Sequence, residues 1–213
     1  MRYFLFDLDG TLTDPKEGIT RSVQYALHRF GIERECDELM CFIGPPLKEQ
    51  FMDYAGLTRE QAEKAVEVYR ERFAPIGVFE NRAYEGAAEL LRYLKDTGKT
   101  VALATSKPQI FADQIVKKYG LAPYFDLVLG SELDGTRTDK SQVIAEVLYR
   151  LGANPHEAIM IGDRKHDIIG AKANGIKSVG VSFGYAADGE LETAGADYIV
   201  DNMDELRTLL AYL

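Results

Sequence analysis

Cysteine and histidine are scarce in this chain of 213 residues. Its two cysteines, Cys36 and Cys41, stand apart from its three histidines, and their spacing matches no zinc site or redox pair. We therefore interpret both as reduced, structural thiols. No zinc site is expected.

Long apolar runs and an excess of positive charge are also missing. No stretch approaches the roughly 20 residues that a membrane-spanning helix needs, and the segment before Asp7 is too short for a signal peptide. The formal net charge of −9 argues against a nucleic-acid surface, which would need clustered lysine and arginine. We expect a cytoplasmic protein without a membrane or nucleic-acid partner. Its oligomeric state is not indicated by the sequence.

The common nucleotide-binding motifs are absent as well. No G-x-G-x-x-G occurs, and Gly98-Lys99-Thr100 lacks the upstream glycine of a P-loop, because Tyr93 stands there. If the chain binds a phosphate, it must do so with other groups.

What the sequence does contain is a change of apolar period along the chain. Between residues 16 and 77 only helical spacing occurs, with helices expected at 17–30, 35–41, 46–54 and 58–73. After residue 84, short apolar strands alternate with helices. The expected strands are 101–105, 127–130, 158–161, 178–181 and 198–200, and the expected helices are 87–97, 108–119, 140–151, 167–174 and 203–212.

This alternation predicts the fold class. Repeated βαβ units give a doubly wound, mostly parallel sheet with helices on both faces, as in Rossmann-like α/β proteins. The apolar run at residues 3–6 belongs to the same sheet, so the helical block is an insertion after the first strand. We expect an α/β core of residues 1–14 and 81–213, and a small all-α domain of residues 15–80.

Two acids, Asp7 and Asp9, follow the first strand and precede Gly10. If strand pairing continues to Asp9, the two side chains point the same way. Carboxylates so close together need a cation, a shared proton or separate roles. A simpler interpretation is a turn at Asp9-Gly10 in which Asp7 is the Asx residue.

Ligands of open α/β sheets bind at the carboxyl ends of the strands, so residues there are candidates for a site. Thr105, Ser106 and Lys107 follow one strand, and Pro108 is expected to open the next helix, which would place hydroxyls and helix amides where a phosphate could bind. The alternative for the two hydroxyls is simple helix capping.

Two further strand ends carry charge. Arg137 and Lys140 lie near a helix start, where a cation is unfavourable unless an anion is close. Asp163 and Asp167 follow another strand, and could merely complement the dipole of the next helix. Acids, hydroxyls and a lysine at one sheet edge together predict a site for Mg²⁺ and a phosphate.

With these residues in view, the chain resembles the haloacid dehalogenase superfamily of hydrolases, in its phosphoglycolate phosphatase-like branch. The resemblance spans essentially the whole chain. It rests on D-x-D-G-T at 7–11, Thr105 followed by Ser-Lys-Pro, Lys140, and G-D-x-x-x-D at 162–167. It implies a Mg²⁺-dependent phosphomonoester hydrolase that acts on a small phosphorylated metabolite.

The resemblance also implies roles for the acids. Asp7 would be the nucleophile that forms an aspartyl-phosphate, and Asp9 the general acid and then the general base. Asp163 and Asp167 would hold Mg²⁺ together with Asp7 and the backbone carbonyl of Asp9. An acid at position 9 favours a phosphatase or phosphomutase over the dehalogenases of the superfamily.

Phosphate binding falls to Thr105 and Lys140 by the same resemblance, with Ser106 beside them. The family's lysine is often followed by proline, whereas here Ser141 follows Lys140, so Arg137 is an alternative cation. We favour Lys140, because it opens the helix that precedes the strand before Gly162.

The inserted helices resemble the family's small α-helical cap, which closes over the site. The segment 42–47 matches a recurrent cap loop, so Gly44, Pro45 and the nearby Lys48 are expected to contact the leaving group. The substrate stays open: phosphoglycolate, a sugar phosphate, a nucleoside monophosphate, pyrophosphate and an aryl phosphate would all fit the core.

Two other functions remain in view. A β-phosphoglucomutase-like phosphomutase would share every core residue and differ in the cap. A non-enzymatic receiver-type signalling domain also combines acids, Mg²⁺, a hydroxyl residue and a lysine on a doubly wound sheet. Its acids lie on different strands of a much shorter chain without a helical cap.

Overall fold

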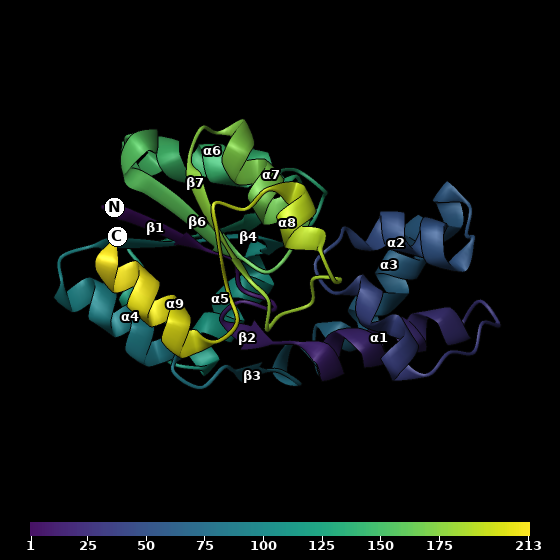
Figure 1. The fold of residues 1–213 in the computed structure, drawn as a ribbon. Coiled ribbons are helices and arrows are strands. Elements are labelled where there is room, and N and C mark those ends of the chain that lie inside the picture. Colours follow the sequence, from purple (N-terminus) through teal and green to yellow (C-terminus); the bar gives the residue numbers. More distant parts are fainter. The chain divides into compact units, whose positions relative to one another are not determined.

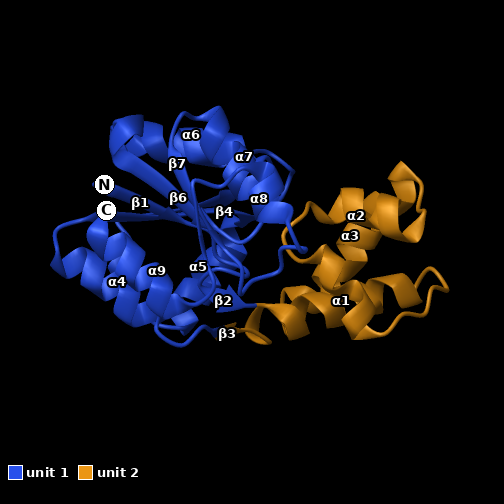
Figure 2. Cartoon of the chain, in the orientation of Figure 1, with its two compact units in different colours: residues 1–14, 83–213 blue, residues 15–82 orange.

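The computed structural model describes residues 1–213, which form two compact units. The core unit comprises residues 1–14 and 83–213, and the helical unit comprises residues 15–82 (Figure 2). The boundary expected after residue 80 therefore lies two residues later. No helix combines the length and the apolar character that crossing a membrane would require.

Six parallel strands form the sheet of the core unit, in the order β5-β4-β1-β6-β7-β8. They are β1 (Tyr3–Phe6), β4 (Thr100–Pro108), β5 (Leu127–Ser131), β6 (Ala158–Gly162), β7 (Lys177–Val181) and β8 (Tyr198–Val200). β1 lies between β4 and β6, with Tyr3 opposite Thr100 and Ala158. A central strand is buried on both faces, which explains why β1 is apolar throughout rather than alternating.

Helices cover both faces of this sheet, as the alternating pattern predicts (Figure 1). One face carries α4 (Ala87–Asp96), α5 (Gln109–Lys118) and α9 (Met203–Tyr212), and the other carries α6 (Lys140–Leu151), α7 (Lys165–Ala173) and α8 (Glu190–Ala194). Short 3₁₀ turns, η3 (Ala122–Tyr124) and η4 (Pro155–Glu157), precede β5 and β6. Under α6, the buried side chains of Val143, Ile144 and Val147 share one apolar cluster with Leu5 and Met160 of the sheet. The predicted α/β fold is confirmed.

The helical unit contains α1 (Lys16–His28), α2 (Leu47–Ala55) and α3 (Arg59–Phe73), with 3₁₀ segments η1 (Cys36–Phe42) and η2 (Gly77–Phe79). Thr58 caps α3: its side chain accepts from the Gln61 amide at 3.3 Å. The helix expected at 35–41 is a 3₁₀ segment instead. Two short strands, β2 (Thr13–Asp14) and β3 (Arg82–Ala83), pair where the chain passes between the two units.

The structure corrects the starts of two expected helices and adds one helix that was not expected. β4 continues to Pro108 after a register shift beyond Ala104, so Pro108 precedes α5 rather than opening it. α7 begins at Lys165, which makes Asp167 its third residue rather than its first. α8 was not expected, because it has only five residues and stands between two glycines in left-handed conformation, Gly189 and Gly195.

Candidate active site

The turn after β1 holds the two acids of the D-x-D motif. The Asp7 amide still continues the sheet, donating to the Ile161 carbonyl at 2.9 Å. Asp9 lies beyond it in a turn whose centre is the Leu8 carbonyl, which accepts from the Leu12 amide at 2.9 Å. The expectation that strand pairing aligns the two side chains is therefore wrong. Both residues are nevertheless buried, 6% and 9% exposed as whole residues.

Lys140 is the cation beside Asp7. Asp139 caps α6, accepting from the Ser141 amide at 2.7 Å, and so fixes Lys140 as the first helical residue. The Lys140 Nζ lies 2.8 Å from both Asp7 Oδ1 and Asp167 Oδ1, and donates to the Ala104 carbonyl at 3.1 Å. Burial disfavours the ammonium, but the charges of Asp167 and Asp7 raise the pKa of Lys140 above its ordinary value.

Arg137 lies in the loop before α6 and takes another partner. Its guanidinium is 2.5 Å from Glu132 Oε1, at a site where the Glu132 side chain is 49% exposed. The φ angle of Arg137 is 59°, which makes it the one non-glycine residue in the left-handed region. The geometry therefore favours Lys140 over Arg137 as the site's cation.

Asp163 and Asp167 come from the end of β6 and the start of α7. Asp163 accepts from the Tyr185 amide at 2.8 Å and from the Thr11 hydroxyl at 3.4 Å. Asp167, in the first turn of α7, accepts from the Arg164 amide at 3.0 Å as part of the capping box of that helix. Burial, followed by nearby negative charge, raises the pKa of Asp163 well above its usual range. Burial likewise raises the pKa of Asp167.

Two glycines make room for Asp163. A Cβ at Gly10, whose φ is +83°, would stand 2.1 Å from Asp163 Oδ2. A Cβ at Gly184 would stand 2.3 Å from the Asp163 Cβ. The backbone thus approaches this carboxylate from two sides, which only residues without a side chain permit.

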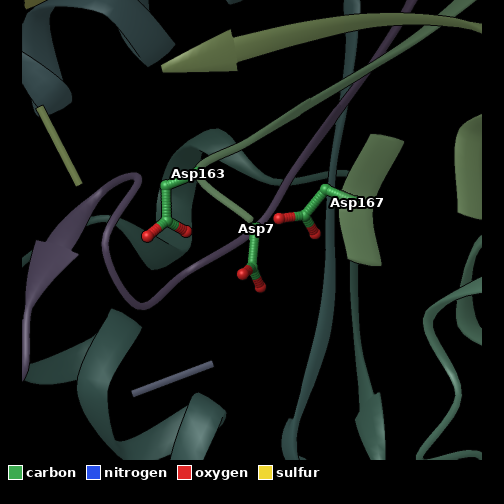
Figure 3. Close-up of side chains that lie close together, drawn as sticks. All are labelled: Asp7, Asp163 and Asp167. Carbon is green, nitrogen blue, oxygen red and sulfur yellow. The ribbon is translucent and has the colours of Figure 1, made fainter. Parts of the chain in front are cut away.

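Asp7, Asp163 and Asp167 converge on one small space (Figure 3). Each offers a carboxylate oxygen, and these oxygens all lie within 4.8 Å of one another. The Lys140 ammonium cannot neutralise three buried carboxylates, so the cluster fits an additional cation. Carboxylate oxygens are the donors that Mg²⁺ prefers. The Asp9 side chain is outside this cluster.

The hydroxyl residues lie where β4 departs from its regular pairing. Thr105 is buried, and its Oγ1 accepts from the Lys107 amide at 3.2 Å. It cannot cap α5, since β4 runs on to Pro108, so the capping interpretation is wrong for Thr105. Ser106 is half-buried, and its carbonyl accepts from the Ser131 hydroxyl at 2.8 Å.

Lys107 is a site residue whose role sequence reasoning missed. Its Nζ lies 2.5 Å from Asp9 Oδ2, and the two side chains are 6% and 12% exposed. Asp9 Oδ1 is buried without a hydrogen-bond partner. Burial raises the pKa of Asp9, and the Lys107 charge opposes this shift only in part.

A model of the family described as haloacid dehalogenase-like hydrolase matches residues 4–181 of this chain. The chain belongs to this family. A 5′-nucleotidase from Pseudomonas aeruginosa is 46% identical over 99% of this chain and 96% of its own length. The tyrosine-protein kinase PtkA of Mycobacterium tuberculosis is 36% identical over 97% of this chain and 71% of its own length.

Solved structures agree with this assignment. A predicted phosphatase from Clostridium acetobutylicum superimposes with a TM-score of 0.97, at 46% identity, over 100% of this chain and 99% of that one. A putative phosphatase from Clostridium difficile has a TM-score of 0.88 at 47% identity, over 98% of each chain. This haloacid dehalogenase-like hydrolase is a phosphatase, as the sequence predicts.

The residues expected to contact the leaving group lie within the helical unit. Gly44, whose φ is 103°, and Pro45 connect η1 to α2. Lys48 in the first turn of α2 pairs with Glu63 of α3 at 2.8 Å. Lys48 therefore already has a partner within its own unit, which the sequence did not indicate.

The loop after β7 is the second feature that sequence reasoning missed. The site residues predicted from the sequence follow four strands, but Gly184 and Tyr185 follow a fifth. The Tyr185 amide donates to Asp163, and Gly184 lies close to the same side chain. The Tyr185 hydroxyl also bonds to the Asp14 carboxylate, at the residue before the helical unit begins. The signal was present, since this loop too follows the carboxyl end of a parallel strand.

Proposed function

We propose that this hydrolase is a Mg²⁺-dependent phosphomonoesterase that acts on small phosphorylated metabolites through an aspartyl-phosphate on Asp7. The observation that carries the proposal is the buried cluster of Asp7, Asp163 and Asp167 beside Lys140. Nucleoside 5′-monophosphates are the first substrates to test. This choice is supported by the 46% identity to a protein named 5′-nucleotidase.

Asp7, Asp163 and Asp167 would hold the Mg²⁺, with the backbone carbonyl of Asp9 as a further oxygen donor. Bound there, Mg²⁺ would reduce the repulsion between a carboxylate nucleophile and a phosphate dianion. The raised pKa of Asp163, caused by burial and by its acidic neighbours, supports a site that is incomplete without such a cation.

The chain's own residues supply the remaining chemistry. Lys140 neutralises negative charge and keeps Asp7 oriented by its 2.8 Å ion pair. The hydroxyls of Thr105 and Ser106 bind phosphoryl oxygens. Asp9 gives a proton to the leaving-group oxygen while Asp7 attacks phosphorus, and later takes a proton from the water that releases phosphate. The covalent route divides one difficult displacement into two easier ones.

The test combines metal removal with Asp7→Asn. We expect EDTA and Asp7→Asn each to abolish hydrolysis of p-nitrophenyl phosphate and of nucleoside 5′-monophosphates. Asp96→Asn, an exposed acid of α4, is the matched control and should keep full activity. Mg²⁺ should raise the melting temperature of the wild type more than that of Asp163→Asn, because a ligand stabilises only the state that binds it.

The outcomes separate the parts of the proposal. Full activity of Asp7→Asn would exclude the covalent mechanism, and activity that survives EDTA would exclude the metal. The substrate panel should include phosphoglycolate, pyrophosphate, an aryl phosphate and a hexose 1-phosphate. Isomerisation of the hexose phosphate without phosphate release would favour the phosphomutase instead.

A further inference from the structure

The two carboxyl oxygens of Asp9 have different surroundings. Oδ2 lies 2.5 Å from the Lys107 ammonium, whereas Oδ1 is buried and has no hydrogen-bond partner. Little water reaches this pair, since the side chains are 6% and 12% exposed. A charge-assisted hydrogen bond that is shielded from water in this way is strong, and it fixes the orientation of the carboxyl group.

The backbone of Lys107 is fixed by contacts of its own. It lies between Ala104 and Pro108, where β4 shifts register against β5. Its amide donates to the Thr105 Oγ1 at 3.2 Å, so its main chain is tied to a residue proposed to bind phosphate. The same short segment therefore positions both the hydroxyl and the lysine.

We propose that Lys107 is a positioning residue for Asp9: by holding Oδ2, it presents Oδ1 as the oxygen that exchanges protons during catalysis. This inference rests on the proposed function. In the first half-reaction the bond from Asp7 to phosphorus forms, the bond from phosphorus to the leaving group breaks, and the Oδ1 proton moves to the departing oxygen. In the second, water oxygen bonds to phosphorus, the bond to Asp7 breaks, and Oδ1 takes a proton from the water.

The test is a double-mutant cycle between Lys107→Met and Asp9→Asn. The readout is kcat/KM for p-nitrophenyl phosphate, which has a good leaving group, and for an alkyl phosphate, which has a poor one. Asp9→Asn should cost about 10²–10⁴ with the alkyl ester. Lys107→Met should cost up to about 10² with that ester and much less with the aryl ester, because misplacement of the acid matters most for a poor leaving group.

In the Asp9→Asn background, Lys107→Met should have no further effect, since the group that it positions is already absent. Lys95→Met is the matched control: the Lys95 Nζ also lies 2.5 Å from a carboxylate, that of Asp126, but this pair is 30% and 36% exposed. Lys95→Met should leave kcat/KM unchanged for both the aryl and the alkyl ester.

Three results would overturn the inference: an equal loss for both esters, a loss that adds to that of Asp9→Asn, or no loss at all. If Asp9→Asn itself retains full activity, the proposed function fails rather than the role of Lys107. Should Lys107→Met fail to fold, Lys107→Arg and Lys107→Gln replace it. Arg should restore the wild-type leaving-group dependence and Gln should not, whereas equal restoration by both would contradict the need for a charge.

Discussion

The core unit and the helical unit differ in how deeply their charged side chains are buried. The core unit buries the side chains of two lysines and four acids near the ends of β1, β4 and β6, namely Asp7, Asp9, Lys107, Lys140, Asp163 and Asp167. Most ion pairs of the helical unit lie at its surface, such as Lys16 with Asp37, Lys48 with Glu63 and Lys64 with Glu67. Its best-shielded pair is Arg72 with Glu80, with side chains 17% and 18% exposed.

This difference indicates where function resides. Burying a charge is costly, so buried clusters of acids persist where chemistry requires them. Exposed ion pairs contribute only about 0–1 kcal/mol each and need no such explanation. Changes to the buried charges of the core unit should therefore affect both activity and stability, whereas changes to the exposed ion pairs of the helical unit should affect at most the choice of substrate.

The largest expected effect comes from removing the buried cation beside Asp7. Lys140→Met should lower kcat by about 10³. It should also reduce the free energy of unfolding by about 3–5 kcal/mol, because it leaves buried carboxylates unpaired. Arg137→Met, which removes a partly exposed cation from the same region, is the control. Steady-state kinetics measures kcat, and urea unfolding measures the free energy of unfolding. A greater loss of activity in Arg137→Met than in Lys140→Met would reverse the assignment of the cation.

An intermediate effect should follow from Gly184→Ala. The new Cβ would stand 2.3 Å from the Asp163 Cβ, so this acid must move. We expect Mg²⁺ affinity to fall about 10–100-fold, since Gly184 supports a proposed ligand rather than supplying one. Titration of the melting temperature with Mg²⁺ measures this.

Gly180→Ala is the matched control for that glycine. Its Cβ would meet the Leu191 Cδ1 at 3.0 Å, and the tip of a leucine can shift. Mg²⁺ affinity should stay as in the wild type. An equal loss of affinity in both variants would show that an added methyl group in or after β7 lowers the affinity whatever its distance from Asp163.

The smallest effect should come from the helical unit, which we propose acts as a cap. Lys48→Ala should change the ratio of kcat/KM between two phosphate esters by up to about tenfold, and leave p-nitrophenyl phosphate nearly unaffected. Glu63→Ala, which releases Lys48 from its partner, should also change this kcat/KM ratio, but by a different factor. The unfolding free energy should change by less than about 1 kcal/mol. Identical losses for every ester would remove Lys48 from substrate selection.

The sequence allowed much of the core unit to be predicted, because its signals are local. Alternating apolar runs indicate a parallel sheet, and the carboxyl ends of parallel strands meet at one edge. That rule alone brings Asp7, Asp163 and Lys140 into one region, and the structure places Lys140 within 2.8 Å of Asp7.

The details that escaped prediction depend on contacts between distant residues. The pattern shows that Lys107 follows a strand, but not that its ammonium reaches Asp9, which is 98 positions away. The side-chain direction of Asp9 depended on where β1 stops pairing, and strand ends are poorly defined by composition. Short helices such as α8 carry too few turns to show a period.

Because β1 lies between two strands that come later in the chain, the site can form only after those strands have been synthesised. Asp7 and Asp9 are synthesised before β4 and β6, the strands that pair with β1 and contain Thr100 and Ala158. At typical rates of synthesis, roughly 10–30 s separate the acids from their last partners. The helical unit, residues 15–82, is synthesised within that interval. The proposed nucleophile is thus made before its surroundings, so we expect a nascent chain to acquire phosphatase chemistry only when β6 and Asp163 have emerged.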